Sequence, residues 1–198
     1  MTGNPEVELR ALLVRATPDA IASATTLALT SYGPELVSWL CAMLSETDAH
    51  DAFSILAEEL WKSLPKFDGR CSARTWCYML ARAAVARVLS PAARRREQLV
   101  SHIPSVAHAV TQVWSTTGQR QQRQHNIYAQ IRNELDPDDQ LLLVLRVDRN
   151  LAWNDIALVM LGEHASADEV TRKAATLRKQ FERVKQRLRE LATTERDP

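Results

Sequence analysis

Basic side chains gather on one predicted helix near the C-terminus, and the chemistry they could perform is the binding of phosphate. Residues 174–191, AATLRKQFERVKQRLREL, carry apolar side chains at the spacings of one helical stripe. The stripe consists of Leu177, Phe181, Val184, Leu188 and Leu191. Lys and Arg outnumber Glu on the remaining faces, so once the stripe is docked this helix presents a positive surface.

A helix that enters the major groove of DNA reads bases near its N-terminal end and holds phosphates along the rest of its length. The candidates for DNA contact are therefore Thr176, Arg178, Lys179, Gln180 and Arg183, with Arg172 and Lys173 adding phosphate contacts. The same composition is also typical of a solvated helix face, so the preceding segments decide between the two interpretations.

The formal net charge is only +1, but the charge is segregated along the chain. Between Arg70 and Arg96 there are seven arginines and no acidic residue. Two separate basic regions favour an elongated polyanion touched at two places.

Composition predicts an all-α protein, because glycine is scarce and no stretch alternates apolar and polar residues for long enough to form a strand. The three cysteines lack the spacing of a disulfide framework or a zinc site, and the five histidines are scattered. No glycine-rich phosphate loop or catalytic constellation stands out. We expect a protein with no enzymatic activity, no cofactor, no metal and no membrane insertion, working in the cytoplasm.

Helix signals predict several short helices in the first half of the chain. A first helix covers 5–16; Thr17 caps a second, which Gly33-Pro34 breaks before a third begins; Thr47-Asp48 caps a fourth that ends near Pro65. Ser72 caps a helix over 73–89. The predicted core stripes are Ala49, Phe53, Leu56 and Leu60 in the fourth helix, and Trp76, Leu80 and Ala84 in the last.

Three segments of this half, TSYGPELVSWLCAML, AHDAFSILAEELW and LPKFDGRCSARTWCYMLAR, resemble region 2 of bacterial sigma factors of the sigma-70 family, extracytoplasmic-function type. In that family region 2 binds core RNA polymerase and melts the downstream (minus-ten) promoter box. The resemblance implies that residues 67–72 form a pocket for a flipped base. Phe67 could line this pocket, or it could equally well fill the core. The implied DNA contacts are Phe67, Arg70, Ser72, Arg74, Arg82 and Arg87, and the implied polymerase contacts are Asp48, Asp51, Ser54, Ile55 and Glu58.

The second half resembles region 4 of the same sigma factors, which binds the upstream (minus-thirty-five) promoter box. The resemblance lies in LDPDDQLLLVLRVDRNLAWNDIALVMLG, followed by the recognition-helix segment LRKQFERVKQRLRE. Short helices over 137–149 and 153–161, the latter stopped by Gly162, precede the basic helix in a helix-turn-helix order. Where the family has a tight turn this chain has EHASADEVTRKAAT, which is several residues longer and in which Ser166 and Glu169 predict a capping box that starts the helix near Ala167.

We expect a region 2-like domain over 1–90, a flexible linker over 91–119 and a region 4-like domain over 120–198, with a helix from about Arg120. Apolar residues in the linker form either a short helix or a segment that lies in a groove of a partner: Val100, Ile103, Val106, Val110, Val113 and Trp114. Expected partners are core RNA polymerase, promoter DNA and, by analogy with the family, an anti-sigma factor.

Two other functions stay open at this point. Ser54, Ile55 and Ala83 depart from the family pattern and favour a sigma-derived DNA-binding regulator that no longer engages polymerase. The basic helices are also consistent with a protein-interaction module that docks on an acidic partner.

Overall fold

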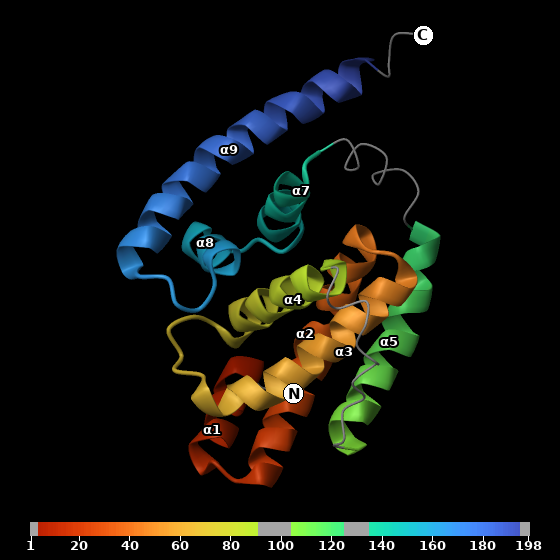
Figure 1. The fold of residues 1–198 in the computed structure, drawn as a ribbon, viewed down its shortest axis with the longest axis vertical. Coiled ribbons are helices and arrows are strands. Elements are labelled where there is room, and N and C mark those ends of the chain that lie inside the picture. The colour runs from red at the N-terminus through yellow and green to blue at the C-terminus, as the bar shows by residue number, and fades with distance from the viewer. Residues whose placement is uncertain (1–3, 91–103, 125–134, 195–198) are drawn as a thin grey trace. The chain divides into compact units, whose positions relative to one another are not determined.

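The computed structural model describes residues 4–90, 104–124 and 135–194, and every regular element in these ranges is helical (Figure 1). The prediction of an all-α protein is therefore confirmed for the part of the chain that is described. The chain divides into two compact units, Met1–Arg123 and Gln124–Pro198.

The first unit contains α1 (Pro5–Arg15), α2 (Pro18–Met43), α3 (Glu46–Ser63), the short 3-10 helix η1 (Leu64–Lys66), α4 (Ala73–Leu89) and α5 (Pro104–Gln124). Side-chain oxygens cap the first four α-helices at their N-termini, because the first N–H groups of a helix lack partners within it. The capping residues are Asn4, Thr17, Ser45 and Ser72. The cap of α3 is thus Ser45, two residues before the predicted Thr47.

Helix α2 runs without interruption through Gly33 and Pro34, so the predicted break at this pair is wrong. A proline inside a helix removes one hydrogen bond and costs about 3 kcal/mol. Apolar side chains that are almost completely buried on both sides of the pair, among them Leu29 and Leu36, offset this local cost. Gly33 is itself buried against other helices, while Pro34 is exposed.

The core of the first unit lies where α2, α3 and α4 meet. The predicted α3 stripe of Ala49, Phe53, Leu56 and Leu60 is buried, which confirms it. In α4, Trp76 and Ala84 are buried as predicted, whereas Leu80 is half-buried.

Helix α5 occupies the second half of the stretch that the sequence predicts as a linker. Val106, Ala109 and Val113 are buried, and Trp114 packs edge-on against His50 with ring centroids 4.9 Å apart. The helix alternative for these apolar residues is the one the structure adopts, and α5 belongs to the first unit. Its outer face carries the Ser, Thr and Gln residues that give the stretch its linker-like composition. Val100 and Ile103 lie outside the described residues.

The second unit contains α7 (Pro137–Leu143), the π-helix η3 (Val144–Asp148), α8 (Trp153–Leu161) and α9 (Ala167–Thr194). Leu142, Leu145, Ile156 and Leu177 are fully buried at its centre. Further along α9, Val184 is buried with Leu135 and Leu143, and Phe181 and Leu188 pack partly exposed against this cluster. The apolar stripe predicted from 177 to 188 is therefore the docking face of α9. The helix expected between Arg120 and Leu135 falls largely outside the described residues.

Candidate nucleic-acid interface

The turn between α8 and α9 is short because the inserted residues lengthen the helix. Gly162 ends α8 at φ +94°, a backbone conformation that favours glycine, and its N–H donates to the Leu158 carbonyl at 2.8 Å. Residues 163–166 complete the turn, and α9 begins at Ala167, seven residues before Ala174. At 1.5 Å per residue, α9 is longer at its N-terminal end by about 10 Å than the basic segment alone.

The capping box predicted at this end is present. The N–H of Ser166 donates to Oε2 of Glu169 at 2.8 Å, and the N–H of Glu169 donates to Oγ of Ser166 at 3.3 Å. The backbone hydrogen bond from Ser166 is the main cause that lowers the pKa of Glu169 below its usual range. Asp168 and Glu169 are the acidic residues of the first turn, where negative charge complements the helix dipole, and the first cation, Arg172, lies one turn further along.

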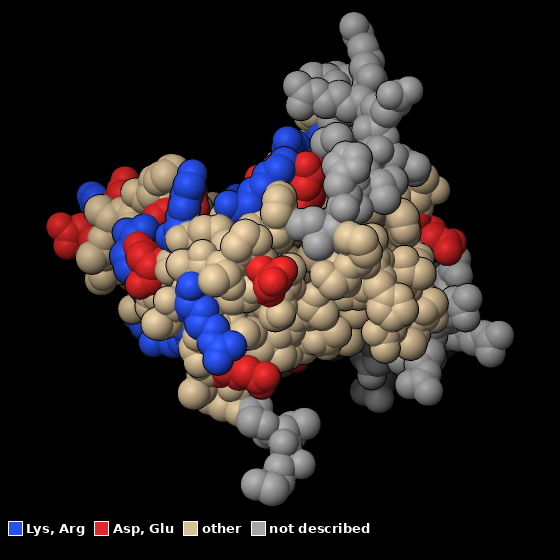
Figure 2. All heavy atoms as spheres, turned by 90° about the horizontal axis from the view of Figure 1, so that it is seen from below, with Lys and Arg blue, Asp and Glu red and all other residues tan. Residues whose placement is uncertain are grey.

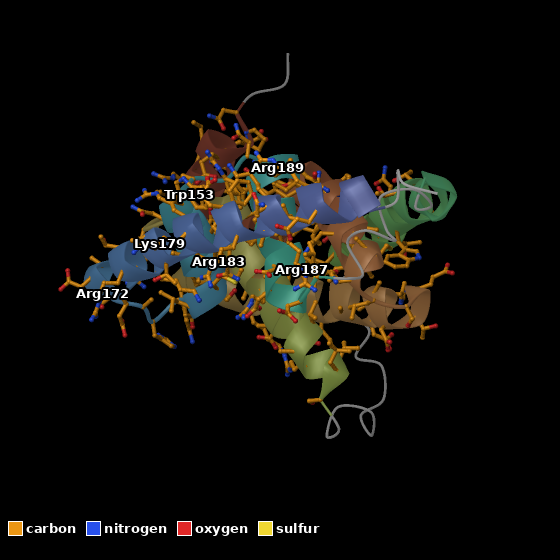
Figure 3. The ribbon with its side chains drawn as sticks, turned by 90° about the horizontal axis from the view of Figure 1, so that it is seen from above. Trp153, Arg172, Lys179, Arg183, Arg187 and Arg189 are labelled. Atoms are coloured by element: carbon orange, nitrogen blue, oxygen red, sulfur yellow. The ribbon has the colours of Figure 1, made fainter. Side chains whose placement is uncertain are left out.

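The cations of α9 fall into two rows on different sides of the helix. The first cationic row consists of Arg172, Lys179, Arg183 and Arg187, with Thr176 between them. Spacings of seven, four and four place these residues above one another along the helix, and all of them are exposed (Figure 3). The second cationic row consists of Arg178, Lys185 and Arg189.

The second cationic row lies on the side where aromatic rings pack. The guanidinium carbon of Arg178 is 5.9 Å from the centroid of the Trp153 ring, and that of Arg146 is 4.8 Å from it. Nη1 of Arg146 also donates to the Leu151 carbonyl at 2.9 Å. The Phe181 ring meets Trp153 at 5.6 Å in an edge-to-face contact. Arg178, a predicted DNA contact, therefore belongs to a cluster centred on Trp153.

Trp153 is a residue whose role the sequence did not reveal, since the pattern placed it among the apolar residues of α8. Of two other predicted contacts on α9, one has a structural partner and one is half-buried. Nε2 of Gln180 donates to Oδ1 of Asp139 at 2.6 Å, which ties α9 to α7, and Lys173 is half-buried. Of the seven predicted residues, the structure brings four together in the exposed row: Arg172, Thr176, Lys179 and Arg183.

The cations predicted to bind DNA in the first unit mostly face carboxylates. Nε and Nη2 of Arg74 donate to the two carboxylate oxygens of Glu35 at 2.7 and 2.6 Å, and this hydrogen bonding raises the pKa of Arg74. Arg70 pairs with Asp68 at 2.7 Å, and Arg87 with Glu59 at 2.7 Å. On the face shown in Figure 2, basic and acidic side chains likewise lie next to each other.

The remaining predicted contacts of this unit line the loop before α4 or belong to α4. Phe67 is half-buried and packs edge-on against Trp76, with ring centroids 5.4 Å apart. Oγ of Ser72 accepts from the N–H of Thr75 at 3.0 Å, and Arg82 is half-buried. Phe67 thus covers part of the core and still has one exposed side at the loop.

The residues predicted to bind polymerase lie on α3, away from its buried stripe. Asp51, Ser54, Ile55 and Glu58 are all half-buried and share one side of the helix. Asp48 has a structural role as well, because its N–H donates to Oγ of the capping Ser45 at 3.2 Å.

Comparison with known proteins identifies the part of the chain that contains α3 and α4. Residues 28–96 match the family model described as Sigma-70 region 2, whereas no curated protein and no solved structure matches the chain. In the described ranges, no helix has the length and apolar character needed to cross a membrane. The match spans the second part of α2, α3, η1 and α4, the helices that build the core of the first unit. Residues 28–96 therefore carry a region 2 of the type found in the sigma-70 family of transcription initiation factors.

Proposed function

We propose that the chain is a sigma factor of the extracytoplasmic-function type that binds core RNA polymerase, directs it to promoters and helps to open them, working in the cytoplasm. The observation that carries this proposal is the region 2 match over residues 28–96. In this proposal the exposed side of α3 contacts polymerase, and the loop 67–72 with the start of α4 meets the downstream promoter box.

The second unit supplies the contact with the upstream promoter box. Helices α8 and α9, joined by residues 162–166, follow one another in the order of a helix-turn-helix. The first cationic row is exposed along α9 and would run beside the phosphates, while Thr176 faces the groove.

The four cations of the first row set the expected salt dependence. Neutralising about four phosphates corresponds to a slope of log K against log salt of about −3.6. The affinity for promoter DNA should then fall roughly 150-fold between 50 and 200 mM salt.

The test measures transcription and DNA binding by purified chain with core polymerase on a library of promoter fragments. The variant Lys179→Ala/Arg183→Ala removes two cations of the first row, and Lys185→Ala/Arg189→Ala is the matched control on the second row of the same helix. We expect the first variant to reduce the salt slope by about 2 and the control to leave it nearly unchanged. Equal effects of both variants would contradict the assignment of the first row to DNA.

A second candidate function is a sigma-derived regulator that binds DNA without polymerase. The pairing of Arg70, Arg74 and Arg87 with carboxylates favours it, and so does the half-buried Ile55 among the predicted polymerase contacts of α3. Salt-dependent DNA binding with no polymerase association under any condition would support this function and refute the first. Binding of neither partner would leave the protein-interaction module. An anti-sigma partner stays a prediction.

A further inference from the structure

Helix α1 lies before the region 2 match and contacts the loop that the proposed function assigns to the promoter. The N–H of Ala73, the first residue of α4, donates to both carboxylate oxygens of Glu6, at 3.1 and 3.0 Å. The Glu6 side chain is 22% exposed. Oδ1 of Asn4 accepts from the N–H of Glu6 at 3.0 Å and so holds the start of α1. A residue from another helix thereby satisfies an N–H group that α4 cannot satisfy itself.

The carboxylate of Glu6 works together with the local cap of α4. Ser72 accepts from Thr75, and Glu6 accepts from Ala73, so two different donors of the first turn have partners. A negative charge at this end also complements the dipole of the helix. The start of α4 is therefore fixed relative to α1 as well as within itself.

Arg10, one turn after Glu6, reaches the middle of the same loop. Its Nη2 lies 3.6 Å from Oε1 of Glu6 and 3.8 Å from the position that a Cβ on Gly69 would occupy. Gly69 has φ +74°, which favours glycine, and the adjacent N–H of Arg70 donates to Oδ1 of Asp68 at 3.1 Å. Helix α1 thus contacts the first residue of α4 through Glu6 and places Arg10 near the centre of the loop.

We infer that Glu6 and Arg10 are positioning residues for promoter opening, which hold the loop 67–72 and the first turn of α4 in the geometry that receives the separated DNA strand. This inference rests on the proposed function. The region 2 match begins at residue 28 and does not include either residue. Capture of a base out of a duplex costs a few kcal/mol of stacking and pairing. If the pocket is already ordered before DNA binds, less of the binding free energy is used to order the pocket. More of it then remains to separate the two DNA strands.

The experiment compares transcription from a fully paired promoter with transcription from the same promoter carrying a pre-opened bubble at the downstream box. The variants are Glu6→Ala, Glu6→Gln and Arg10→Ala in the full chain with core polymerase. The control is Glu8→Ala, which removes the same charge from an exposed position of the same helix. Retained activity on the bubble template shows that each variant is folded and bound to polymerase.

We expect Glu6→Ala to lower transcription from the paired promoter about tenfold relative to the bubble template. Glu6→Gln, which keeps an oxygen acceptor but loses the charge, should fall between Glu6→Ala and the wild type. Arg10→Ala should lower the ratio of paired-promoter to bubble-template transcription by a smaller factor. Glu8→Ala should leave this ratio unchanged. Equal losses on both templates, or no loss on either, would overturn the positioning role. Absence of transcript from the wild-type chain on both templates would instead refute the proposed function.

Discussion

Substitution of Gly33 by alanine should loosen the attachment of α5 to the first unit. A Cβ at this position would lie 2.9 Å from Cγ1 of Val113 and 3.3 Å from Cζ of Phe53. Alanine in place of glycine favours a helix interior by about 1 kcal/mol, whereas overpacking of a core costs about 1–3 kcal/mol. The two effects oppose each other, so the free energy of unfolding should fall by about 0–2 kcal/mol.

A double-mutant cycle with Val113→Ala separates the two effects. Val113→Ala alone should cost about 2 kcal/mol, because it removes two buried methyl groups. In that background the closest contact, with Val113, is gone and only the contact with Phe53 remains, so Gly33→Ala should stabilise the protein by up to about 1 kcal/mol. The expected coupling free energy between the two substitutions is about 1–3 kcal/mol.

The assay is urea denaturation of the four proteins, followed by the fluorescence of tryptophan and by hydrogen exchange of the α5 amides. Trp114 reports on α5, because its ring lies 6.5 Å from the Phe53 ring. Hydrogen exchange resolves the local opening of α5 from the unfolding of the rest of the unit. A coupling below about 0.5 kcal/mol would refute the packing of Val113 against Gly33. So would an increase in stability of about 1 kcal/mol for Gly33→Ala in the wild-type background.

Three further predictions follow from contacts in the two units. Ser166→Ala should cost about 1 kcal/mol of helix stability, seen as faster exchange of the first α9 amides. The pKa of Glu169 lies below its usual range, so its stabilising effect is complete at neutral pH and is lost as the pH falls through that lowered pKa; NMR titration should show the pKa rising toward its usual range in Ser166→Ala. Burial raises the pKa of the Cys77 thiol, so iodoacetamide should modify Cys77 more slowly than Cys71 until the protein unfolds, as mass spectrometry can measure. Trp153→Ala should lower the free energy of unfolding of the second unit by about 1–3 kcal/mol, which thermal denaturation can test.

Features that depend on neighbours within one helical turn could be predicted from the sequence. The caps at Thr17 and Ser72, the stop at Gly162 and the capping box of Ser166 and Glu169 all join residues at most four positions apart. Hydrophobic periodicity likewise predicted the buried stripe of α3. These patterns also carry the resemblance to region 2, which the family match confirms.

Other features depended on residues that meet only in the folded chain. Local signals at Gly33 and Pro34 predicted a break, but the burial of apolar side chains on both sides keeps α2 continuous. The linker-like composition of the stretch before Gln119 gave no indication that α5 packs against the first unit. Arg74 and Gln180 form hydrogen bonds with Glu35 and Asp139, which lie 39 and 41 positions away in the chain. Such distant pairs cannot be recognised from the local sequence pattern.

The basic helix shows the same division. Its sequence determined that it is amphipathic, cationic and extended at the N-terminal end, because these properties follow from helical spacing and from a local cap. Only the tertiary structure decided which cations lie beside an aromatic ring, because Trp153 comes from another helix and its ring centroid lies 5.9 Å from Arg178. The contact between Glu6 and Ala73, 67 positions apart, is of the same kind. Short-range hydrogen bonds and hydrophobic periodicity can be recognised in the sequence, because the residues involved are close neighbours in the chain. The pairing of distant polar groups depends instead on how the helices pack.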